Sequence, residues 1–106
     1  MAGKDITIDD PGRVSRLAAA LIHELRIEVL LAHANGGPAS ATMLAKEDLG
    51  SLGSVAYHQV KLRELGVLER VNTRKKRGAY ERIYDLTDFG REVLETAVAF
   101  GSERDA

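Results

Sequence analysis

The segment spanning residues 51–87 constrains the fold more than any other part of the chain. A helical pattern over residues 52–66 leads without a real linker into two stretches of strand-like composition, residues 67–73 and 79–86. The residues between these stretches, 74–78, read Arg-Lys-Lys-Arg-Gly. Two such stretches around a short polar tip predict an antiparallel hairpin. We therefore expect an exposed helix beside a hairpin that carries a cluster of cations at its tip.

Two helices are predicted in the first third of the chain. The first begins at Pro11, because either of the two aspartates before it can cap the helix and a proline at the first helical position loses no hydrogen bond. The second begins near His23 or Glu24. It stops at residues 35–38, Asn-Gly-Gly-Pro, where glycine and proline prevent its continuation.

A short third helix is predicted between Ser40, its cap, and about Asp48, with Met43 and Leu44 facing inward and Gly50 ending it. The next helix follows after a very short turn. Two short helices joined this tightly cross at a steep angle, which is the helix-turn-helix unit. On the second of them, helical spacing predicts an inward face of Leu52, Val55, Gln59, Leu62 and Gly66, and an outward face of Tyr57, Val60, Lys61 and Glu64.

A final helix is predicted after Thr87, its cap. The expected fold is mainly α with a small β-hairpin, in the order α-α-α-α-β-β-α. The 106 residues suit a single domain over residues 1–106, with flexible tails at 1–9 and 101–106.

Apolar side chains recur at helical spacing on both the first and the last predicted helix. They are Val14, Leu17 and Leu21 on the first, and Phe89, Val93, Ala97 and Phe100 on the last. So small a chain cannot cover both stripes within one subunit. We therefore expect a homodimer that forms through the first and last helices.

The overall composition excludes several classes of protein. There is no cysteine, so disulfides and thiolate metal sites are excluded. No apolar run approaches the roughly 18 residues of a membrane span, and no export signal is recognised, so we expect a cytoplasmic protein without a membrane partner. The three histidines, His23, His33 and His58, fall on different predicted helices, so no metal or cofactor is expected. No nucleophile with a base or paired carboxylates is found, so we do not expect an enzyme.

The charge of the chain is nearly balanced, with 15 basic and 16 acidic residues, but the cations gather locally. Residues 70–82 hold six of them against the single acid Glu81. A basic hairpin beside an exposed polar helix is suited to double-stranded DNA, with the helix in the major groove and the hairpin over the phosphates. The candidate DNA-binding residues are Ser51, Ser54, Tyr57, His58 and Lys61 on the helix and Arg74, Lys75, Lys76 and Arg77 on the hairpin. A solvated helix face and an edge turn protected by lysine remain the simpler alternatives.

Four motifs in this order resemble the ArsR-like winged helix-turn-helix transcriptional regulators, in particular a metal-free bacterial group. They are Leu25-Arg26-Ile27, Gly53-Ser54-Val55-Ala56-Tyr57-His58, Leu62-Arg63-Glu64-Leu65-Gly66-Val67-Leu68-Glu69 and Arg77-Gly78-Ala79-Tyr80-Glu81-Arg82-Ile83-Tyr84. The resemblance covers about residues 20–90. It implies a homodimer in which each fourth helix reads half of a palindromic operator. The chain departs from the family pattern at Gln59, usually aliphatic, and at Val60, usually Lys or Arg; its cation comes one place later, at Lys61.

The sequence thus predicts a dimeric, sequence-specific DNA-binding transcriptional regulator, and more specifically a repressor. The alternative is a winged helix used as a protein-interaction module, similar to an anti-repressor or antitoxin, whose basic hairpin meets an acidic protein. A small-molecule effector has no support from any convergent set of polar residues. The operator, the regulated gene and the sign of regulation do not follow from the sequence.

Overall fold

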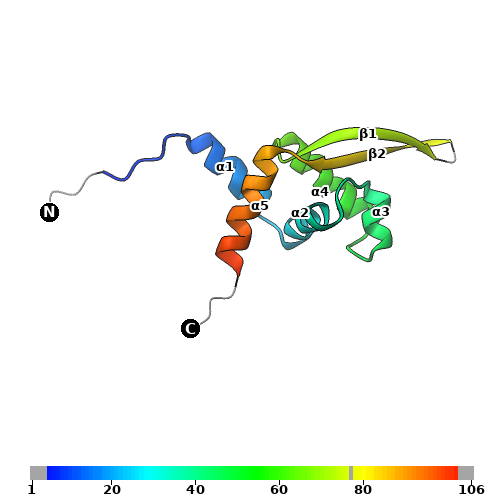
Figure 1. The fold of residues 1–106 in the computed structure, drawn as a ribbon, viewed down its shortest axis with the longest axis horizontal. Coiled ribbons are helices and arrows are strands. Elements are labelled where there is room, and N and C mark those ends of the chain that lie inside the picture. The colour runs from blue at the N-terminus through cyan, green and yellow to red at the C-terminus, as the bar shows by residue number, and fades with distance from the viewer. Residues whose placement is uncertain (1–4, 77, 103–106) are drawn as a thin grey trace.

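The computed structural model describes residues 5–76 and 78–102. Within them five helices and one hairpin follow the predicted order (Figure 1). The helices are α1 (Pro11–Ala20), α2 (Glu24–Gly36), α3 (Ala41–Lys46), α4 (Leu52–Glu64) and α5 (Asp88–Gly101), and the strands are β1 (Leu68–Lys76) and β2 (Ala79–Leu86). Gly101 still belongs to α5, although it was expected in the tail. Residues 1–4 and 103–106 of the expected tails lie outside the described residues.

Short polar side chains set where the helices begin. The Asp10 carboxylate accepts from the backbone N–H of Arg13 at 3.0 Å, so α1 starts at the predicted cap. Ser40, Ser51 and Thr87 cap α3, α4 and α5 in the same manner, each accepting from the N–H three residues on. Each cap satisfies a donor that the first turn of a helix leaves free. These boundaries therefore follow from local sequence alone.

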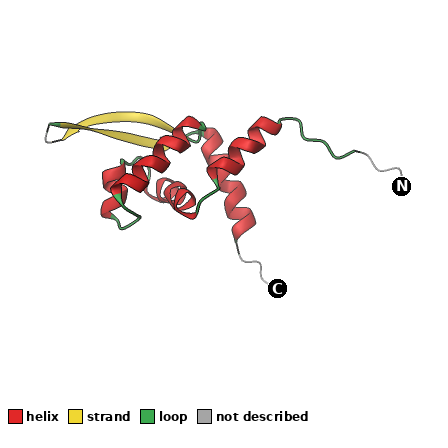
Figure 2. Cartoon of the chain, turned by 180° about the vertical axis from the view of Figure 1, so that it is seen from behind, coloured by secondary structure: helices red, strands yellow, loops and turns green. Residues whose placement is uncertain are grey.

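The two strands form a single antiparallel hairpin that projects beyond the helices (Figure 2). β1 extends to Lys76, three residues beyond the predicted end at residue 73, and only residues 77–78 separate it from β2. The ladder continues because Arg74 pairs with Glu81 and Lys75 with Tyr80 across the two strands. The predicted five-residue tip is therefore mostly strand.

The hydrophobic core lies between α2, α4, the base of the hairpin and the start of α5. Val29, Leu30, Val55, Leu62 and Val93 are fully buried in it. α3 contributes Leu44 but not Met43, which is 37% exposed and contradicts the prediction. A helix of six residues offers its neighbour one narrow face, and consecutive residues point about 100° apart, so only one of the two can face α4.

A buried polar cluster joins α4 to α2. Nδ1 of His33 lies 3.2 Å from the Gly37 carbonyl oxygen, and its Nε2 lies 3.2 Å from Nε2 of Gln59. Because a carbonyl only accepts, His33 donates from Nδ1 and accepts at Nε2, which makes the ring neutral. The Gln59 amide also donates to the Ala39 carbonyl at 3.3 Å. The side-chain amide nitrogen of Gln59, a residue unusual at this position, therefore has two partners inside the core.

The start of α5 is fixed against the turn between α4 and β1. The Thr87 hydroxyl donates to the Gly66 carbonyl at 2.5 Å, and the Thr87 N–H donates to the Val67 carbonyl at 3.0 Å. Gly90 packs so closely that a Cβ atom there would lie 2.1 Å from the Val67 oxygen. The position of α5 relative to the turn after α4 is therefore set by the Thr87 hydroxyl together with backbone atoms.

None of the helices in the described part of the chain combines the length and the hydropathy that crossing a membrane requires.

Candidate nucleic-acid interface

α4 presents a row of exposed side chains along the face opposite the core. Ser51 caps the helix and its hydroxyl donates to the Ser54 hydroxyl at 2.9 Å, so both serines lie at the exposed N-terminus. Tyr57, one turn on, is 55% exposed. The Lys61 ammonium lies 5.6 Å from the centre of the Tyr57 ring and 3.4 Å from a Glu64 carboxylate oxygen. Tyr57 and Lys61 thus lie on the face predicted for them, but Leu52, which was predicted to face inward, is 52% exposed because it lies in the first turn, at the end of the helix.

His58 lies in the interior, although it was predicted among the DNA contacts. It is 8% exposed, and Nδ1 of its ring accepts from Nε of Arg26 on α2 at 3.2 Å. Nη1 of Arg26 in turn donates to the Ala19 carbonyl at the end of α1, at 2.7 Å. The reason is helical spacing: position 58 follows Val55 by three residues and precedes Leu62 by four, so it shares their buried face. His58 therefore joins the buried face of α4 to α2.

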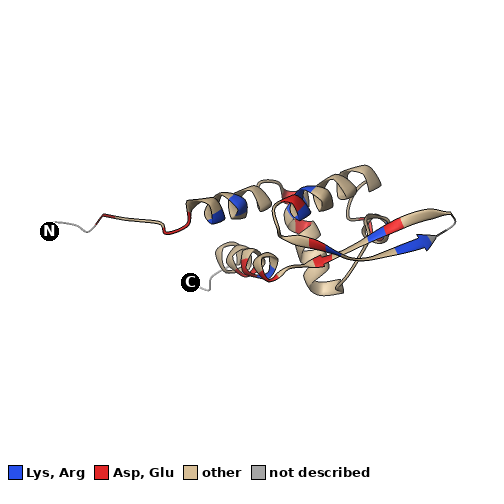
Figure 3. Cartoon of the chain, turned by 90° about the horizontal axis from the view of Figure 1, so that it is seen from above, with Lys and Arg blue, Asp and Glu red and all other residues tan. Residues whose placement is uncertain are grey.

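Arg74 is also placed differently from the prediction. Its Nε and Nη2 donate to one carboxylate oxygen of Glu81 at 3.0 and 2.6 Å. Two donors on one carboxylate neutralise both groups and hold the guanidinium against the strand. Lys75 is exposed on β1, whereas the Lys76 side chain and Arg77 lie outside the described residues. Figure 3 shows the basic end of β1 and the acidic and basic residues that alternate on β2.

Glu81 also connects the hairpin to α3. Its second carboxylate oxygen accepts from the Ser40 hydroxyl at 2.6 Å, and Ser40 is the cap of α3. Next to this contact, Ala39 and Tyr84 exchange two backbone hydrogen bonds of 3.0 Å. Ser40 and Glu81 are both buried. The hairpin is thereby held at a fixed position relative to the α3–α4 pair.

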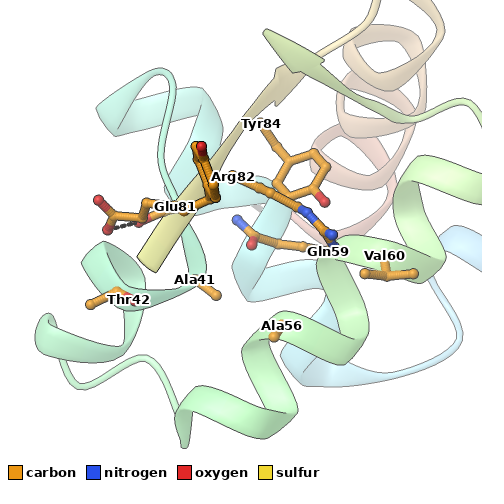
Figure 4. A pocket seen from close by; sticks show the side chains of 10 residues that line it. Ala41, Thr42, Ala56, Gln59, Val60, Glu81, Arg82 and Tyr84 are labelled. Atoms are coloured by element: carbon orange, nitrogen blue, oxygen red, sulfur yellow. Dashed lines mark hydrogen bonds between the residues drawn. The ribbon is translucent and has the colours of Figure 1, made fainter. Parts of the chain in front are cut away.

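A cleft of about 270 Å³ lies between α3, α4 and β2 (Figure 4). Its lining residues are Ser40, Ala41, Thr42, Ala56, Gln59, Val60, Tyr80, Glu81, Arg82 and Tyr84. The Arg82 side chain extends from β2 toward α4 in Figure 4, and it is exposed. The sequence placed Arg82 in the basic segment but not in the site. Strand alternation could not have placed Arg82 there, because Glu81 and Arg82 are neighbours on one strand and both line the cleft.

Known structures match this arrangement, whereas neither the protein-family models nor the curated proteins gave a match. HlyU from Vibrio cholerae superposes with a TM-score of 0.68 over 92% of this chain and 100% of its own, at 19% identity. An ArsR family transcriptional regulator gives 0.60 over 89% and 91%, at 23% identity. Mb0332 from Mycobacterium bovis, described as a homodimeric winged helix-turn-helix DNA-binding domain, gives 0.67 over 99% and 94%, at 19% identity.

The chain has the winged helix-turn-helix fold. In this fold α3 and α4 form the helix-turn-helix, and the β1–β2 hairpin is the wing. The fold class predicted from the sequence is confirmed.

The surface predicted for dimerisation of this winged helix is only partly exposed. Phe100 is 91% exposed and Val14 46% exposed. Leu17, Leu21, Phe89 and Ala97 are half-buried. Val93 is fully buried within its own subunit, so it has no surface to offer a partner and the prediction for it was wrong.

α1 is held against α5 by charged groups around Phe89. The guanidinium carbons of Arg13 and Arg16 lie 4.7 and 5.2 Å from the centre of the Phe89 ring. Arg13 also forms an ion pair with Glu92. Phe89 therefore belongs to the contact between these two helices of the winged helix.

A metal site is not found in the part of the winged helix that the structure describes. Over residues 5–76 and 78–102, no group of three or more His, Cys, Asp or Glu side chains could hold an ion. His23 and His58 stack with ring centres 5.0 Å apart, but Nδ1 of each already accepts a hydrogen bond, from Leu25 N–H and from Arg26 respectively.

Proposed function

We propose that this protein is a dimeric, sequence-specific DNA-binding regulator of transcription. The observation that carries the proposal is the position of the exposed face of α4 beside the wing, with both elements joined to the rest of the domain by buried hydrogen bonds. Ser40 and Glu81 fix the wing to α3, and His33, Gln59 and the Arg26–His58 pair fix α4 to α2. A preorganised surface binds with a smaller loss of conformational entropy than a mobile one.

The exposed residues of α4 have the chemistry of groove recognition. Ser54 and Tyr57 lie in the N-terminal half of the helix, which is the half that approaches the base edges in helix-turn-helix proteins. Their hydroxyls can exchange hydrogen bonds with base edges, and the Tyr57 ring can pack on a thymine methyl group. Lys61 and, on the wing, Lys75 neutralise phosphates, which positions the protein without specifying a sequence.

A second copy of the chain completes the proposed DNA-binding unit. Val14 and Phe100 expose apolar surface on α1 and α5, and the similar Mycobacterium bovis domain is described as homodimeric. We place the subunit contact on these two helices. A two-fold dimer presents two copies of α4, so the operator would be palindromic, with half-site centres about 34 Å or one DNA turn apart, or a multiple of it. By occupying a promoter, the dimer would act as a repressor.

The proposal is tested with a labelled fragment of the promoter of the gene itself and a random duplex of equal length. Binding is followed by fluorescence anisotropy at about 50 and about 200 mM salt. We expect tighter binding to the promoter at both salts, and a steep loss of affinity for both duplexes as salt rises. Equal affinity for the two duplexes would overturn sequence-specific regulation. Absence of binding to either would favour the protein-interaction module instead.

A further inference from the structure

The wing carries two arginines that have the same charge but opposite surroundings. Arg74 on β1 is bound through two nitrogens to Glu81, which is 9% exposed. The Arg82 side chain on β2 has no hydrogen bond and no ion pair within the described part of the chain, and it is exposed at the cleft between the wing and α4. A guanidinium that is already bound to a carboxylate must lose that partner before it can bind a phosphate, whereas a free one loses only water.

The cleft offers the other groups that a sugar-phosphate segment requires. Thr42 and Tyr80 bring hydroxyl groups that can donate to phosphate oxygens. Ala41, Ala56 and Val60 form an apolar wall that suits the carbon face of a deoxyribose. Val60 lies three residues after Tyr57 on α4, so the cleft borders the exposed face of the helix.

The Glu81 carboxylate lines the same cleft and by itself would repel a phosphate. Its charge is offset by Arg74, and its oxygens already accept from Ser40 and Arg74. The cation left without a described partner at the cleft is then Arg82, so the charge that faces an approaching anion is positive.

We propose that the cleft between α4 and β2 binds a DNA backbone phosphate, with Arg82 as its cation, while Glu81 withholds Arg74 from the DNA and fixes the wing wall of the cleft. This inference rests on the proposed function, because it assigns the groups by which the winged helix would grip the backbone. It predicts that two arginines of equal charge contribute differently to DNA binding.

The test compares Arg82→Ala and Arg74→Ala, which remove the same charge from neighbouring strands. The probes are the promoter fragment and the random duplex, and the readout is the slope of log affinity against log salt. Each phosphate contact contributes about 0.9 to this slope, so Arg82→Ala should lower it by about 1.8 in a dimer, on both duplexes. Arg74→Ala should leave the slope unchanged, because it removes no phosphate contact, but it should lower the affinity for both duplexes, because the Glu81 charge at the cleft is no longer offset. Circular dichroism and melting temperature establish that both variants are folded.

The variant Glu81→Gln tests separately whether Glu81 keeps Arg74 from binding DNA. The amide oxygen can still accept from Ser40, but the charge that holds Arg74 is removed. Arg74 is then released, and the slope should become steeper by up to about 1.8 per dimer. A purely structural role for Glu81 would lower the melting temperature without changing the slope. Adding Arg74→Ala to this variant should restore the slope of the unmodified protein.

The results separate this inference from the proposed function. The cleft assignment is overturned if Arg74→Ala reduces the salt dependence of the affinity, or if Arg82→Ala leaves it unchanged, even when promoter recognition is intact. If the unmodified protein binds both duplexes equally, sequence-specific regulation fails, yet the two arginine variants still decide whether the cleft holds a phosphate. Binding to neither duplex excludes both.

Discussion

Nε of Arg26 donates to Nδ1 of His58 at 3.2 Å, and this bond joins α2 to the exposed helix α4 from the inside. A guanidinium can only donate, so His58 accepts at Nδ1 and carries its proton on Nε2. Protonation of Nδ1 would break the bond and place two cations together. Burial, then Arg26, then His23 lower the pKa of His58 below its ordinary value of 6.5. Burial also lowers the pKa of His33, against the opposing effects of the Gly37 carbonyl and Asp85.

The first prediction is that the protein loses stability on mild acidification. In both histidines the folded state has the lower pKa, so the unfolded chain takes up protons first as the pH falls below 6.5. The stabilisation from the neutral rings should be complete above pH 6.5 and decline as the pH falls through the lowered folded values. Urea unfolding at about pH 7.5 and about pH 5.5 measures this. His58→Gln, whose amide oxygen can still accept from Arg26, should reduce the difference, and an undiminished difference would contradict the role of His58.

The second prediction separates two contacts on α4. Tyr57→Ala should reduce discrimination between promoter and random DNA by about 1–3 kcal/mol, because in the proposed complex the exposed ring and hydroxyl of Tyr57 meet the base edges. Lys61→Ala should weaken binding to both duplexes similarly, since a phosphate contact carries no sequence information. Competition binding with both duplexes measures the difference. Both side chains face away from the core, so neither variant should unfold. Loss of discrimination in Lys61→Ala alone would reverse the two assignments.

The third prediction concerns the subunit contact. Phe100→Asp should give folded monomers that bind DNA poorly, because an unpaired charge buried at a subunit contact is unfavourable and Phe100 is exposed in the single chain. Val93→Asp should instead unfold the chain, since Val93 is fully buried within it. Light scattering and circular dichroism distinguish the two outcomes. A monomeric state of the unmodified protein would exclude the proposed dimer.

The fourth prediction tests the junction between α5 and the turn after α4. Gly90→Ala should destabilise the protein by several kcal/mol or displace α5, because its Cβ would lie 2.1 Å from the Val67 oxygen. Gly53→Ala is the matched control: it also lies in the first turn of a helix, and its Cβ would have no neighbour within 4 Å. It should be neutral or stabilising by up to about 1 kcal/mol. Similar melting temperatures for the two variants would contradict the close contact.

Those parts of the fold that depend on near neighbours could be predicted from the sequence. Asp10, Ser40 and Thr87 cap helices because a side chain three residues ahead of a free N–H can reach it, whatever the rest of the chain does. β2 was predicted with its observed ends, Ala79 and Leu86, because aromatic and branched residues bounded by turn residues define it.

The remaining features depend on contacts between distant residues. The residues near Gln59 in the sequence do not indicate that its amide will form hydrogen bonds with His33 and Ala39. The residues near Arg74 do not indicate that the register of the hairpin places Glu81 opposite it. His58 was assigned to the DNA contacts by its residue type and Val93 to a subunit contact by its helical spacing, but both side chains are buried within the subunit. The candidate DNA-binding residues themselves remain predictions.

Because of the junction of Thr87 and Gly90 with the turn after α4, the spacing of the two copies of α4 and the identity of their outward residues can change independently. The bond to Gly66 depends on the Thr87 hydroxyl, but the Thr87 N–H bond to the Val67 oxygen and the close approach of Gly90 to the same oxygen involve main-chain atoms, which no substitution removes. In the proposed dimer, the distance between the two copies of α4 is thus inherited from the backbone. The outward residues of α4 are free to change without altering that distance. A lineage of such proteins could therefore acquire new target sequences while keeping the same half-site spacing.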